Sequence, residues 1–454
     1  MLYTFPSGFQ WGVATSAYQI EGAVDSRGLS VWDTFSQTPD RVLNGHTGTV
    51  ACDHVNRYRE DIALMAELGV RHYRFSISWP RVLPEGRGTV NQKGLAFYDE
   101  LVDTLLSYGI TPHATLFHWD SPQALEIEYG SWRSRQMAQD FADYVGVVVR
   151  HLGDRITHWI TLNEIFCFTH LGYGVNQIPE MAPGSVVQTA KEVWQTSHHA
   201  LLAHGLGCQA IRAYAPRPCS VALVDNFLAA VPISETPEHI AAAQKAFHTL
   251  GTNGGIIFPA LTGAYSPLLL EQLGEDAPGV EAGDLQTIHQ PLDALGFNVY
   301  TGVYVRASEN PLGYEVLPFP KGYPRMHMPW LYVLPDSLYW GVRHVNETLN
   351  RDDLKIFISE NGCAAQDELT AQREVLDLDR IHYLRQYLQS AHRAVSEGYP
   401  LMGYFLWSFL DNFEWAYGYD RRFGITYVDY STQDRIAKAS FRWYANCVQE
   451  NRIV

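Results

Sequence analysis

Cysteine, basic side chains and long apolar runs are all scarce in this chain of 454 residues. Its six cysteines are scattered without a C-x-x-C pair or tight spacing, which argues against a disulfide framework and favours free thiols in a reducing cytoplasm. Lys and Arg number 33 against 49 Asp and Glu, a net charge of −16, so neither nucleic acid nor an anionic membrane surface is an expected partner.

Membrane and export signals are missing as well. No apolar run approaches the ~18 residues that a membrane-spanning helix needs. Residues 1–9 contain neither a charged stretch nor a continuous apolar stretch, so we expect no signal peptide and a cytoplasmic location.

Motifs of several other chemistries are also absent. There is no H-E-x-x-H, no G-x-S-x-G, no P-loop and no G-x-G-x-x-G in the first strand–helix unit, which excludes serine hydrolases and nucleotide-binding proteins. His198, His199 and His204 share one helical pattern without a supporting cluster of carboxylates. We therefore expect no metal ion and no cofactor.

Aromatic residues, by contrast, are abundant, with 12 Trp, 26 Tyr and 20 Phe. A hydrophobic content of 46% over this length predicts a large buried core and excludes global disorder, and many of these rings belong to that core. The surplus also suits a cleft that stacks on flat, weakly polar ligands. Composition alone leaves both interpretations open.

Eight short runs rich in β-branched and aromatic residues recur along the chain. Most are almost continuously apolar, as expected for parallel strands that are covered on both faces. The predicted strands are residues 9–16, 71–78, 111–117, 157–163, 219–226, 292–300, 355–359 and 403–409.

Amphipathic helical patterns lie between these runs, with apolar residues at i, i+3 and i+4 spacing. They cover residues 95–106, 137–152, 191–214, 336–350 and 376–397, with Asp336 as the expected N-cap of the fourth and Gly109, Gly153 and Gly398 just past three of the ends.

Strand and helix alternate eight times, which is typical of a (β/α)8 TIM barrel with its active site at the C-terminal ends of the strands. A doubly wound open sheet is the rival fold, but eight such units would close a barrel. The Pro- and Gly-rich segments 178–184, 276–283 and 310–330 are expected as long loops. No segment reads as an interdomain linker, so we predict one catalytic α/β domain over residues 1–454.

Two of the predicted strands end in a glutamate. Glu164 follows the fourth strand and Glu360 follows the seventh, so both side chains are expected in the mouth of the barrel. A single such glutamate is more often a salt-bridged loop residue. Two across one cleft match the requirement of glycoside hydrolysis, in which one carboxyl protonates the leaving oxygen and the other attacks or activates water.

Several longer motifs make the chain resemble the β-glucosidase-type enzymes of glycoside hydrolase family 1. They occur in order, span nearly the whole chain and include every predicted strand except the fifth. The matching segments are FQWGVATSAYQIEG at 9–22, RFSISWPR at 74–81, His118-Trp119, TLNE at 161–164, NVY at 298–300, SENG at 359–362, LWSFLDNFEWAYGY at 406–419 and RFG at 422–424.

The resemblance implies a retaining double displacement, with Glu164 as general acid/base and Glu360 as nucleophile. Glu360 would have to be ionised at rest, and we expect Arg74 and Tyr300 to hold its pKa low. Glu164 would have to be protonated at rest, and we expect low solvation and the charge of Glu360 to raise its pKa.

The resemblance also implies a polar and aromatic shell for the sugar. Some of its members would hydrogen-bond the sugar hydroxyls, and others would stack beneath the sugar ring. Trp330, expected in the loop before the helices of the eighth unit, would be the aglycone platform. The implied members of this shell are Gln19, His118, Trp119, Asn163, Asn298, Trp330, Trp407, Glu414 and Trp415.

The expected substrates are small β-glucosides. Cello-oligosaccharides and aryl or alkyl β-glucosides would lose their non-reducing terminal β-D-glucosyl residue, with side activity on β-galactosides and β-fucosides. A 6-phospho-β-glucosidase is an alternative, but Glu414 would repel a 6-phosphate. A catalytically inactive sugar-binding barrel is another, but both Glu164 and Glu360 are present. Both a monomer and a homo-oligomer are compatible with the sequence.

Two further features lie close to the predicted catalytic glutamates in the sequence. The family usually has a proline after the acid/base glutamate, whereas this chain has Ile165, which restores a peptide N–H that could alter how Glu164 is held. Cys167 and Cys363 lie close to the two glutamates in sequence and are interpreted as small core residues, with sensitivity of the enzyme to thiol reagents as the alternative.

Overall fold

Eight parallel strands close a barrel at the centre of the protein in the computed structural model, which describes residues 3–251, 253–350 and 354–454. Around the barrel the order is β1-β13-β12-β9-β7-β4-β3-β2, so the first strand closes on the last. The strands are β1 Gln10–Ala14, β2 His72–Ser76, β3 Thr111–Thr115, β4 His158–Asn163, β7 Ser220–Asp225, β9 Ala294–Asn298, β12 Lys355–Asn361 and β13 Leu401–Trp407. Each of the eight predicted strands, and the predicted TIM barrel, is confirmed.

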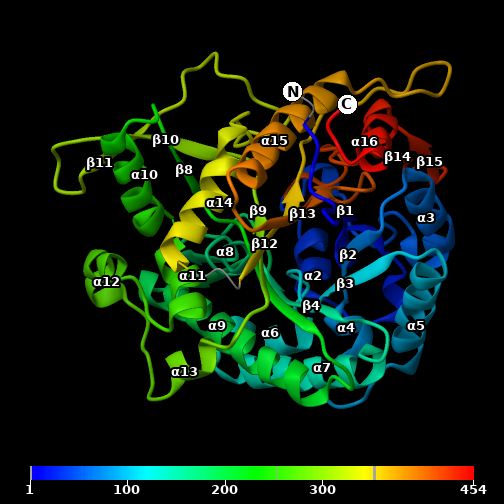
Figure 1. The fold of residues 1–454 in the computed structure, drawn as a ribbon. Helices are drawn as coiled ribbons and strands as arrows, with labels where there is room; N and C mark the ends of the chain where they lie inside the picture. The colour runs from blue at the N-terminus through cyan, green and yellow to red at the C-terminus, as the bar shows by residue number, and fades with distance from the viewer. Residues whose placement is uncertain (1–2, 252, 351–353) are drawn as a thin grey trace.

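The apolar runs form strands because both faces of each strand are buried. In β13, for example, every residue except Met402 is buried. One face packs into the barrel interior and the other against the surrounding helices, as Figure 1 shows.

Long amphipathic helices surround the barrel (Figure 1). They are α3 His54–Leu68, α5 Gln92–Ser107, α7 Gln136–Leu152, α9 Ala190–Tyr214, α10 Pro237–Thr249, α14 Asp336–Leu349, α15 Leu378–Ser396 and α16 Ala439–Glu450. A capping box between Thr189 and Glu192 begins α9. The predicted N-cap is wrong by one position, because Asp336 is the first residue of α14 and Pro335 precedes it at the cap.

Shorter helices lie mostly in the connections. They are α1 Ala17–Ile20, α2 Val31–Gln37, α4 Trp79–Val82, α6 Gln123–Tyr129, α8 Ile165–Thr169, α11 Asn253–Thr262, α12 Pro267–Leu273 and α13 Asp284–Ile288.

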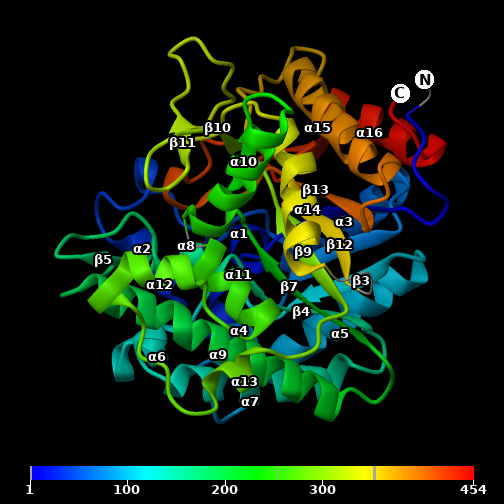
Figure 2. The ribbon, with the colours of Figure 1, turned by 60° about the vertical axis from the view of Figure 1, so that its left-hand side comes forward.

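The described residues form three small sheets outside the barrel, and these were not predicted. One has the order β11-β10-β8 and lies beside α10 in Figures 1 and 2. Because β11 falls inside segment 310–330, the prediction of that whole segment as a loop is wrong. The strands are β8 Ala229–Pro232, β10 Gly302–Ala307 and β11 Tyr314–Leu317, the pair β5 Tyr173–Val175 and β6 Ser185–Val187, and the pair β14 Thr426–Asp429 and β15 Asp434–Ala437.

A buried ionic network supports the segment after β13. Lys438 Nζ lies 2.7 Å from Asp411 and 2.5 Å from Asp367, and Arg422 lies 2.6 Å from Asp411. Removing one partner of a buried ion pair leaves an uncompensated charge, which typically costs about 3–5 kcal/mol. The network therefore holds the segment that leads to Glu414 against the end of the barrel.

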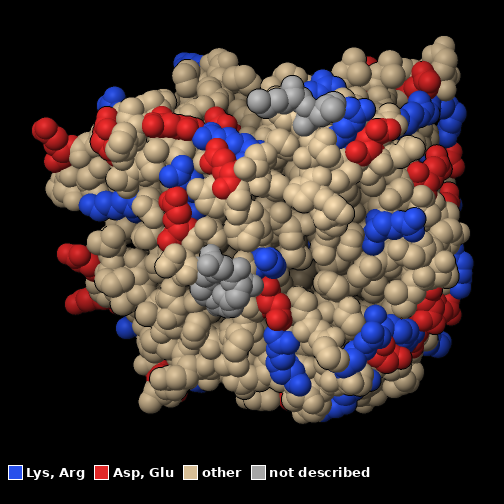
Figure 3. Space-filling view, viewed as in Figure 1, with Lys and Arg blue, Asp and Glu red and all other residues tan. Residues whose placement is uncertain are grey.

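The surface carries charges of both signs. On the face shown in Figure 3, Lys and Arg are interspersed with Asp and Glu and do not gather into one basic patch. None of the helices in the described part of the chain combines the length and the apolar character that crossing a membrane requires.

Candidate active site

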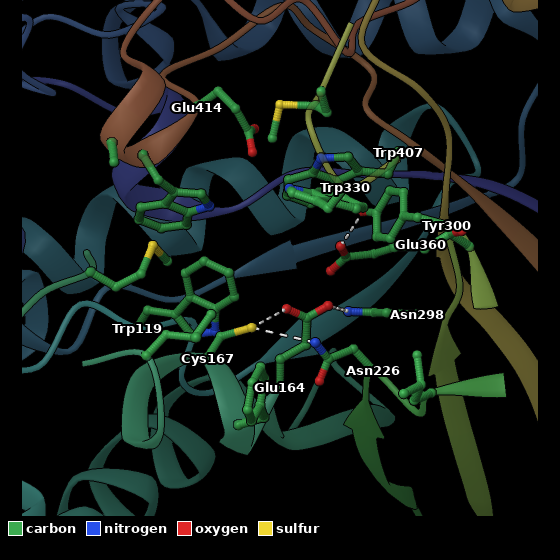
Figure 4. A pocket seen from close by; sticks show the side chains of 18 of the residues that line it. Trp119, Glu164, Cys167, Asn226, Asn298, Tyr300, Trp330, Glu360, Trp407 and Glu414 are labelled. Atoms are coloured by element: carbon green, nitrogen blue, oxygen red, sulfur yellow. Dashed lines mark hydrogen bonds between the residues drawn. The ribbon is translucent and has the colours of Figure 1, made fainter. Parts of the chain in front are cut away.

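A cavity of about 520 Å³ opens at the carboxyl ends of the barrel strands, a size typical of small-molecule sites. Most of the residues predicted for the site lie on its wall (Figure 4). These are His118, Trp119, Glu164, Asn298, Tyr300, Trp330, Glu360, Trp407, Glu414 and Trp415.

Glu360 lies near the end of β12 and is 3% exposed. Arg74 Nη1 donates to its Oε1 at 2.5 Å, and the Tyr300 hydroxyl donates to its Oε2 at 2.7 Å. Both donors are where the sequence predicted them. The expected low pKa is wrong, however, because burial raises the pKa of Glu360 above its ordinary value and Arg74 and Tyr300 only oppose that rise.

Glu164 directly follows β4 and is 5% exposed, with a left-handed backbone at φ +51°. Its Oε1 accepts from Asn298 Nδ2 at 2.7 Å, and its Oε2 accepts from the Cys167 thiol at 3.1 Å. Burial, and next the charge of Glu360, raise the pKa of Glu164, which agrees with the prediction. Among the described residues the donors to the Glu164 carboxyl group are neutral, whereas Glu360 has a guanidinium partner, so a proton shared by the pair resides on Glu164.

Arg74 and Asn163 lie behind the cavity wall and hold its residues in place. Arg74 Nη2 donates to Asn163 Oδ1 at 2.6 Å, and Asn298 Nδ2 reaches the same oxygen at 3.0 Å. Asn163 Nδ2 lies 3.2 Å from His118 Nε2. Burial lowers the pKa of His118 well below its usual value, so the ring is neutral, and with Nε2 accepting from Asn163 the proton is on Nδ1. Among the described residues His118 Nδ1 has no partner, which leaves it free to donate to a ligand.

Aromatic rings form one part of the wall. The His118 ring lies nearly parallel to Trp407, with centroids 5.7 Å apart, and Trp119 lies 4.5 Å from Trp415. Trp330 is 43% exposed and meets Tyr300 edge to face at 5.8 Å. The predicted position of Trp330 in the chain is wrong by two units, because its loop follows β9, the sixth barrel strand, and precedes α14, whereas the prediction placed it before the helices of the eighth unit.

Gln19 is fully buried behind Glu414, outside the residues that line the cavity. Its Nε2 donates to Phe413 O at 2.9 Å and to Asn412 Oδ1 at 3.0 Å, and lies 3.4 Å from Glu414 Oε2. Burial, and next the charge of Glu360, raise the pKa of Glu414 to about 8. The Gln19 amide is thus already used within the protein.

Sequence reasoning missed several apolar residues of the cavity wall. Phe166 lies on α8 and Tyr417 in a single 3-10 turn, and the others lie in irregular loops, where no periodic pattern marks them in the sequence. The residues missed are Phe166, Leu171, Met181, Phe227, Leu228, Met328 and Tyr417.

The two cysteines near the glutamates differ. Cys363 is fully buried and is absent from the residues that line the cavity, as the core interpretation predicts. Cys167 lines the cavity and contacts Glu164, which the core interpretation did not anticipate. Over residues 3–251, 253–350 and 354–454, no group of three or more His, Cys, Asp or Glu side chains is arranged to hold a metal ion.

Comparisons with known proteins agree with this geometry. A family model described as "Glycosyl hydrolase family 1" matches residues 1–453. The chain is 43% identical to Beta-glucosidase A of Thermotoga maritima over 98% of both chains, and 40% identical to a bifunctional beta-D-glucosidase/beta-D-fucosidase of Bifidobacterium breve over 99% of both. A solved β-glucosidase from Thermotoga maritima in complex with deoxynojirimycin superposes with a TM-score of 0.90 at 42% identity, covering 100% of both chains.

These matches confirm the resemblance inferred from the motifs. They extend over nearly the whole chain, and the relatives carry β-glucosidase names, so the protein is a glycoside hydrolase of the β-glucosidase type. The chain belongs to glycosyl hydrolase family 1.

Proposed function

We propose that the protein is a retaining, exo-acting β-glucosidase. It removes the non-reducing terminal β-D-glucosyl residue from cello-oligosaccharides and from aryl and alkyl β-glucosides, with side activity on β-galactosides and β-fucosides. The observation that supports this best is the pair of buried glutamates in one cavity, with the Arg74 guanidinium on Glu360 and the neutral Asn298 amide and Cys167 thiol on Glu164.

In the first step, the Glu360 carboxylate attacks the anomeric carbon while the glycosidic C–O bond breaks. Glu164 gives its proton to the departing oxygen, so that a neutral alcohol leaves and a glycosyl ester of Glu360 remains. This geometry requires the two carboxyl groups to lie about 5–5.5 Å apart, too close for an intervening water.

In the second step, water attacks the same carbon from the side that the leaving group vacated. Glu164, now ionised, takes a proton from that water as the ester bond to Glu360 breaks. The negative charge on Glu360 disappears while the ester exists, which lowers the pKa of Glu164 and prepares it to act as the base. The products are β-glucose, an ionised Glu360 and a protonated Glu164.

The sugar would be held by groups on the cavity wall. His118, Glu414 and Asn298 are polar residues on the cavity wall, and Trp407 and Trp415 offer aromatic faces. Glu414 disfavours a 6-phosphorylated sugar, because a phosphate beside this buried carboxyl group would repel its ionised form and raise its pKa further. The Bifidobacterium breve relative's name, which includes β-D-fucosidase, supports the side activity.

We also propose that residues 1–454 form one catalytic domain. The pairing of β1 with β13 brings the start and the end of the chain into the same barrel, which supports this organisation.

A substrate panel tests the proposal. We expect hydrolysis of p-nitrophenyl β-D-glucoside, slower hydrolysis of the galactoside and fucoside, and stepwise release of glucose from cellobiose through cellopentaose. NMR during the first minutes should show β-glucose forming before its α anomer. Release of α-glucose first, or cleavage within cellopentaose that produces cellobiose and cellotriose as initial products, would contradict a retaining exo-enzyme.

A further inference from the structure

The backbone of Glu164 is held in an unusual conformation by the end of β7. A left-handed φ of +51° is strained for a residue with a side chain, so it persists only where neighbouring groups support it. The Glu164 N–H donates to Val224 O at 3.0 Å, and the next N–H, of Ile165, donates to Asp225 Oδ2 at 3.3 Å. Two successive peptide groups at Glu164 are therefore bound to two successive residues of β7.

Asp225 is a buried carboxyl group that accepts hydrogen bonds from the backbone. It is 2% exposed, and in the part of the chain that the structure describes it forms no ion pair. Its partners are peptide N–H groups, from Ile165 to Oδ2 and from Asn226 to Oδ1 at 2.8 Å. Burial raises the pKa of Asp225 to about 7, opposed by these two hydrogen bonds. A carboxyl group this unfavourable to bury, placed beside Glu164, points to a function there.

The contact with Asp225 requires that residue 165 is not proline. Ile165 is the first residue of α8, a position where proline is well tolerated. Proline has no N–H, however, and would leave Asp225 Oδ2 without this donor. The peptide N–H that Ile165 provides in place of a proline thus donates a hydrogen bond to Asp225.

The same end of β7 also reaches the Glu164 carboxyl group, through a thiol. Asn226 Nδ2 donates to Cys167 Sγ at 3.4 Å, and the Cys167 thiol donates to Glu164 Oε2 at 3.1 Å, as the dashed lines in Figure 4 show. Burial and the nearby Glu164 carboxyl raise the pKa of Cys167 well above its ordinary value, so the sulfur keeps its proton. A thiol is a weak donor and a weak acceptor, which suits a carboxyl group that alternates between protonated and ionised forms.

We propose that Asp225 and Asn226, which we call the β7 tip, position Glu164 for proton transfer. Asp225 acts through the Ile165 N–H, and Asn226 acts through the Cys167 thiol. This inference rests on the proposed function, because it takes Glu164 as the acid/base.

The β7 tip should also shift the pH profile, in a direction that depends on the residue changed. The titratable and charged groups around Glu164 are Glu360 from β12, Tyr300 after β9, Arg74 from β2, Cys167 on α8 and Asp225 on β7. Replacing Asp225 by asparagine removes a negative charge, so the pKa of Glu164 should fall. Replacing Cys167 by alanine removes a donor to the ionised form, so the pKa of Glu164 should rise.

The experiment compares two aryl glucosides with the full-length protein. The leaving group of 2,4-dinitrophenyl β-glucoside departs without acid assistance, whereas that of phenyl β-glucoside needs a proton. For Asp225→Ala we expect kcat/KM to fall roughly 10- to 100-fold on phenyl glucoside and by less than about 3-fold on the dinitrophenyl substrate. The alkaline limb of kcat/KM should move to lower pH in Asp225→Asn and to higher pH in Cys167→Ala, while Cys167→Ser, which keeps a donor, should restore the wild-type limb.

A double-mutant cycle identifies the contact. Ile165→Pro and Asp225→Ala remove the same hydrogen bond, so the double variant should be no slower on phenyl glucoside than the slower single variant. Asp293→Asn is the matched control, because Asp293 Oδ2 accepts the Val221 N–H at the opposite end of β7, at 2.8 Å. Cys208→Ala, a buried cysteine on α9, is the control for Cys167.

Two results would overturn the inference in an enzyme whose wild type hydrolyses both glucosides. One is an equal loss, or no loss, on the two substrates in both Asp225 variants and in Ile165→Pro. The other is an alkaline limb that moves the same way in Asp225→Asn and Cys167→Ala. A wild type that hydrolyses neither glucoside would instead refute the proposed function. If Asp225→Ala does not fold, the pH profiles of kcat/KM for Asp225→Asn and Cys167→Ala still test the inference.

Discussion

The two ends of the barrel bury titratable groups of opposite kinds. At the mouth, burial raises the pKa values of Glu164, Glu360 and Glu414. At the opposite end, where β2 and β4 begin, burial lowers the pKa values of His72 and His158.

The physical cause is the same at both ends, because burial disfavours the charged form of any group. At the mouth this leaves Glu164 with a proton to give, while the Arg74 guanidinium makes Glu360 the ionised member of the pair. At the opposite end burial leaves neutral imidazoles that pack together, with His72 Nδ1 3.1 Å from His113 Nε2 and the rings of His113 and His158 4.3 Å apart. We therefore expect changes at the mouth to alter activity and its pH profile, and changes at the histidine end to alter only stability.

The largest expected effect at the mouth is that of Glu360→Gly. We expect hydrolysis to fall on the order of 10⁴-fold or more, because the nucleophile is lost. Azide should then enter the space left by the carboxylate, displace dinitrophenolate from 2,4-dinitrophenyl β-glucoside and form α-glucosyl azide. NMR of the product checks the anomer. Absence of azide rescue would count against Glu360 as the nucleophile.

Glu164→Ala separates the two carboxyl groups. On phenyl β-glucoside we expect kcat/KM to fall about 10²- to 10⁴-fold, since general acid assistance is lost, with a far smaller fall on the dinitrophenyl substrate. With azide this variant should form β-glucosyl azide, the anomer opposite to that from Glu360→Gly, because azide attacks the ester of Glu360 from the other side. The same anomer from both variants would show that the two roles are wrongly assigned.

Tyr300→Phe sharpens the comparison by removing one donor while keeping the ring. The Tyr300 hydroxyl bonds Glu360 Oε2 at 2.7 Å, and a hydrogen bond to a charged group contributes about 1.5–3 kcal/mol. We expect kcat/KM to fall roughly 10- to 100-fold. Because the hydroxyl lowers the pKa of Glu360, its loss should raise that pKa and move the acid limb of the pH profile to higher pH. An acid limb that stays in place would mean that Glu360 does not set it.

The sequence predicted the barrel because each of its strands is buried on both faces and therefore reads as an apolar run. It did not predict β10 and β11, which lie outside the barrel with half-exposed residues and a mixed pattern. Strand β10 also pairs with a strand distant in the chain, since its first residue, Gly302, lies opposite Ala229 of β8. A local sequence pattern does not reveal such a pairing.

The candidate active site likewise combines residues that the sequence predicts with contacts that it does not. Glu164 and Glu360 were predictable because a strand end in a barrel determines where its side chain points, whereas Asn298 was implied by the motif that resembles the family. The contact between Asp225 and Ile165 joins residues 60 positions apart, and its donor is a backbone N–H that no side-chain pattern reveals. The contacts of Gln19 with residues 412–414 are another example, because they join residues nearly 400 positions apart.

The smallest effect is expected at the histidine end, and it should appear only in stability. Burial, and next the charge of His158, lower the pKa of His72 to about 4. Above pH 6.5 His72 is neutral in both the folded and the unfolded chain, so its titration does not change the free energy of unfolding. Below pH 6.5 the unfolded chain gains a proton that the folded chain refuses, so stability falls as the pH drops toward 4.

His72→Asn places a polar atom near the position of Nδ1 and removes this titration. The wild type should lose stability between pH 7.5 and pH 5, and in His72→Asn that loss should be smaller by up to about 2 kcal/mol. Urea unfolding at the two pH values measures it, with His382→Asn, an exposed histidine of α15, as the control that keeps the wild-type loss. Activity at pH 7 should be unchanged. A variant that instead alters the pH profile of kcat/KM would show that the two ends of the barrel are coupled, because a group remote from the cavity would then change the protonation of Glu164 or Glu360.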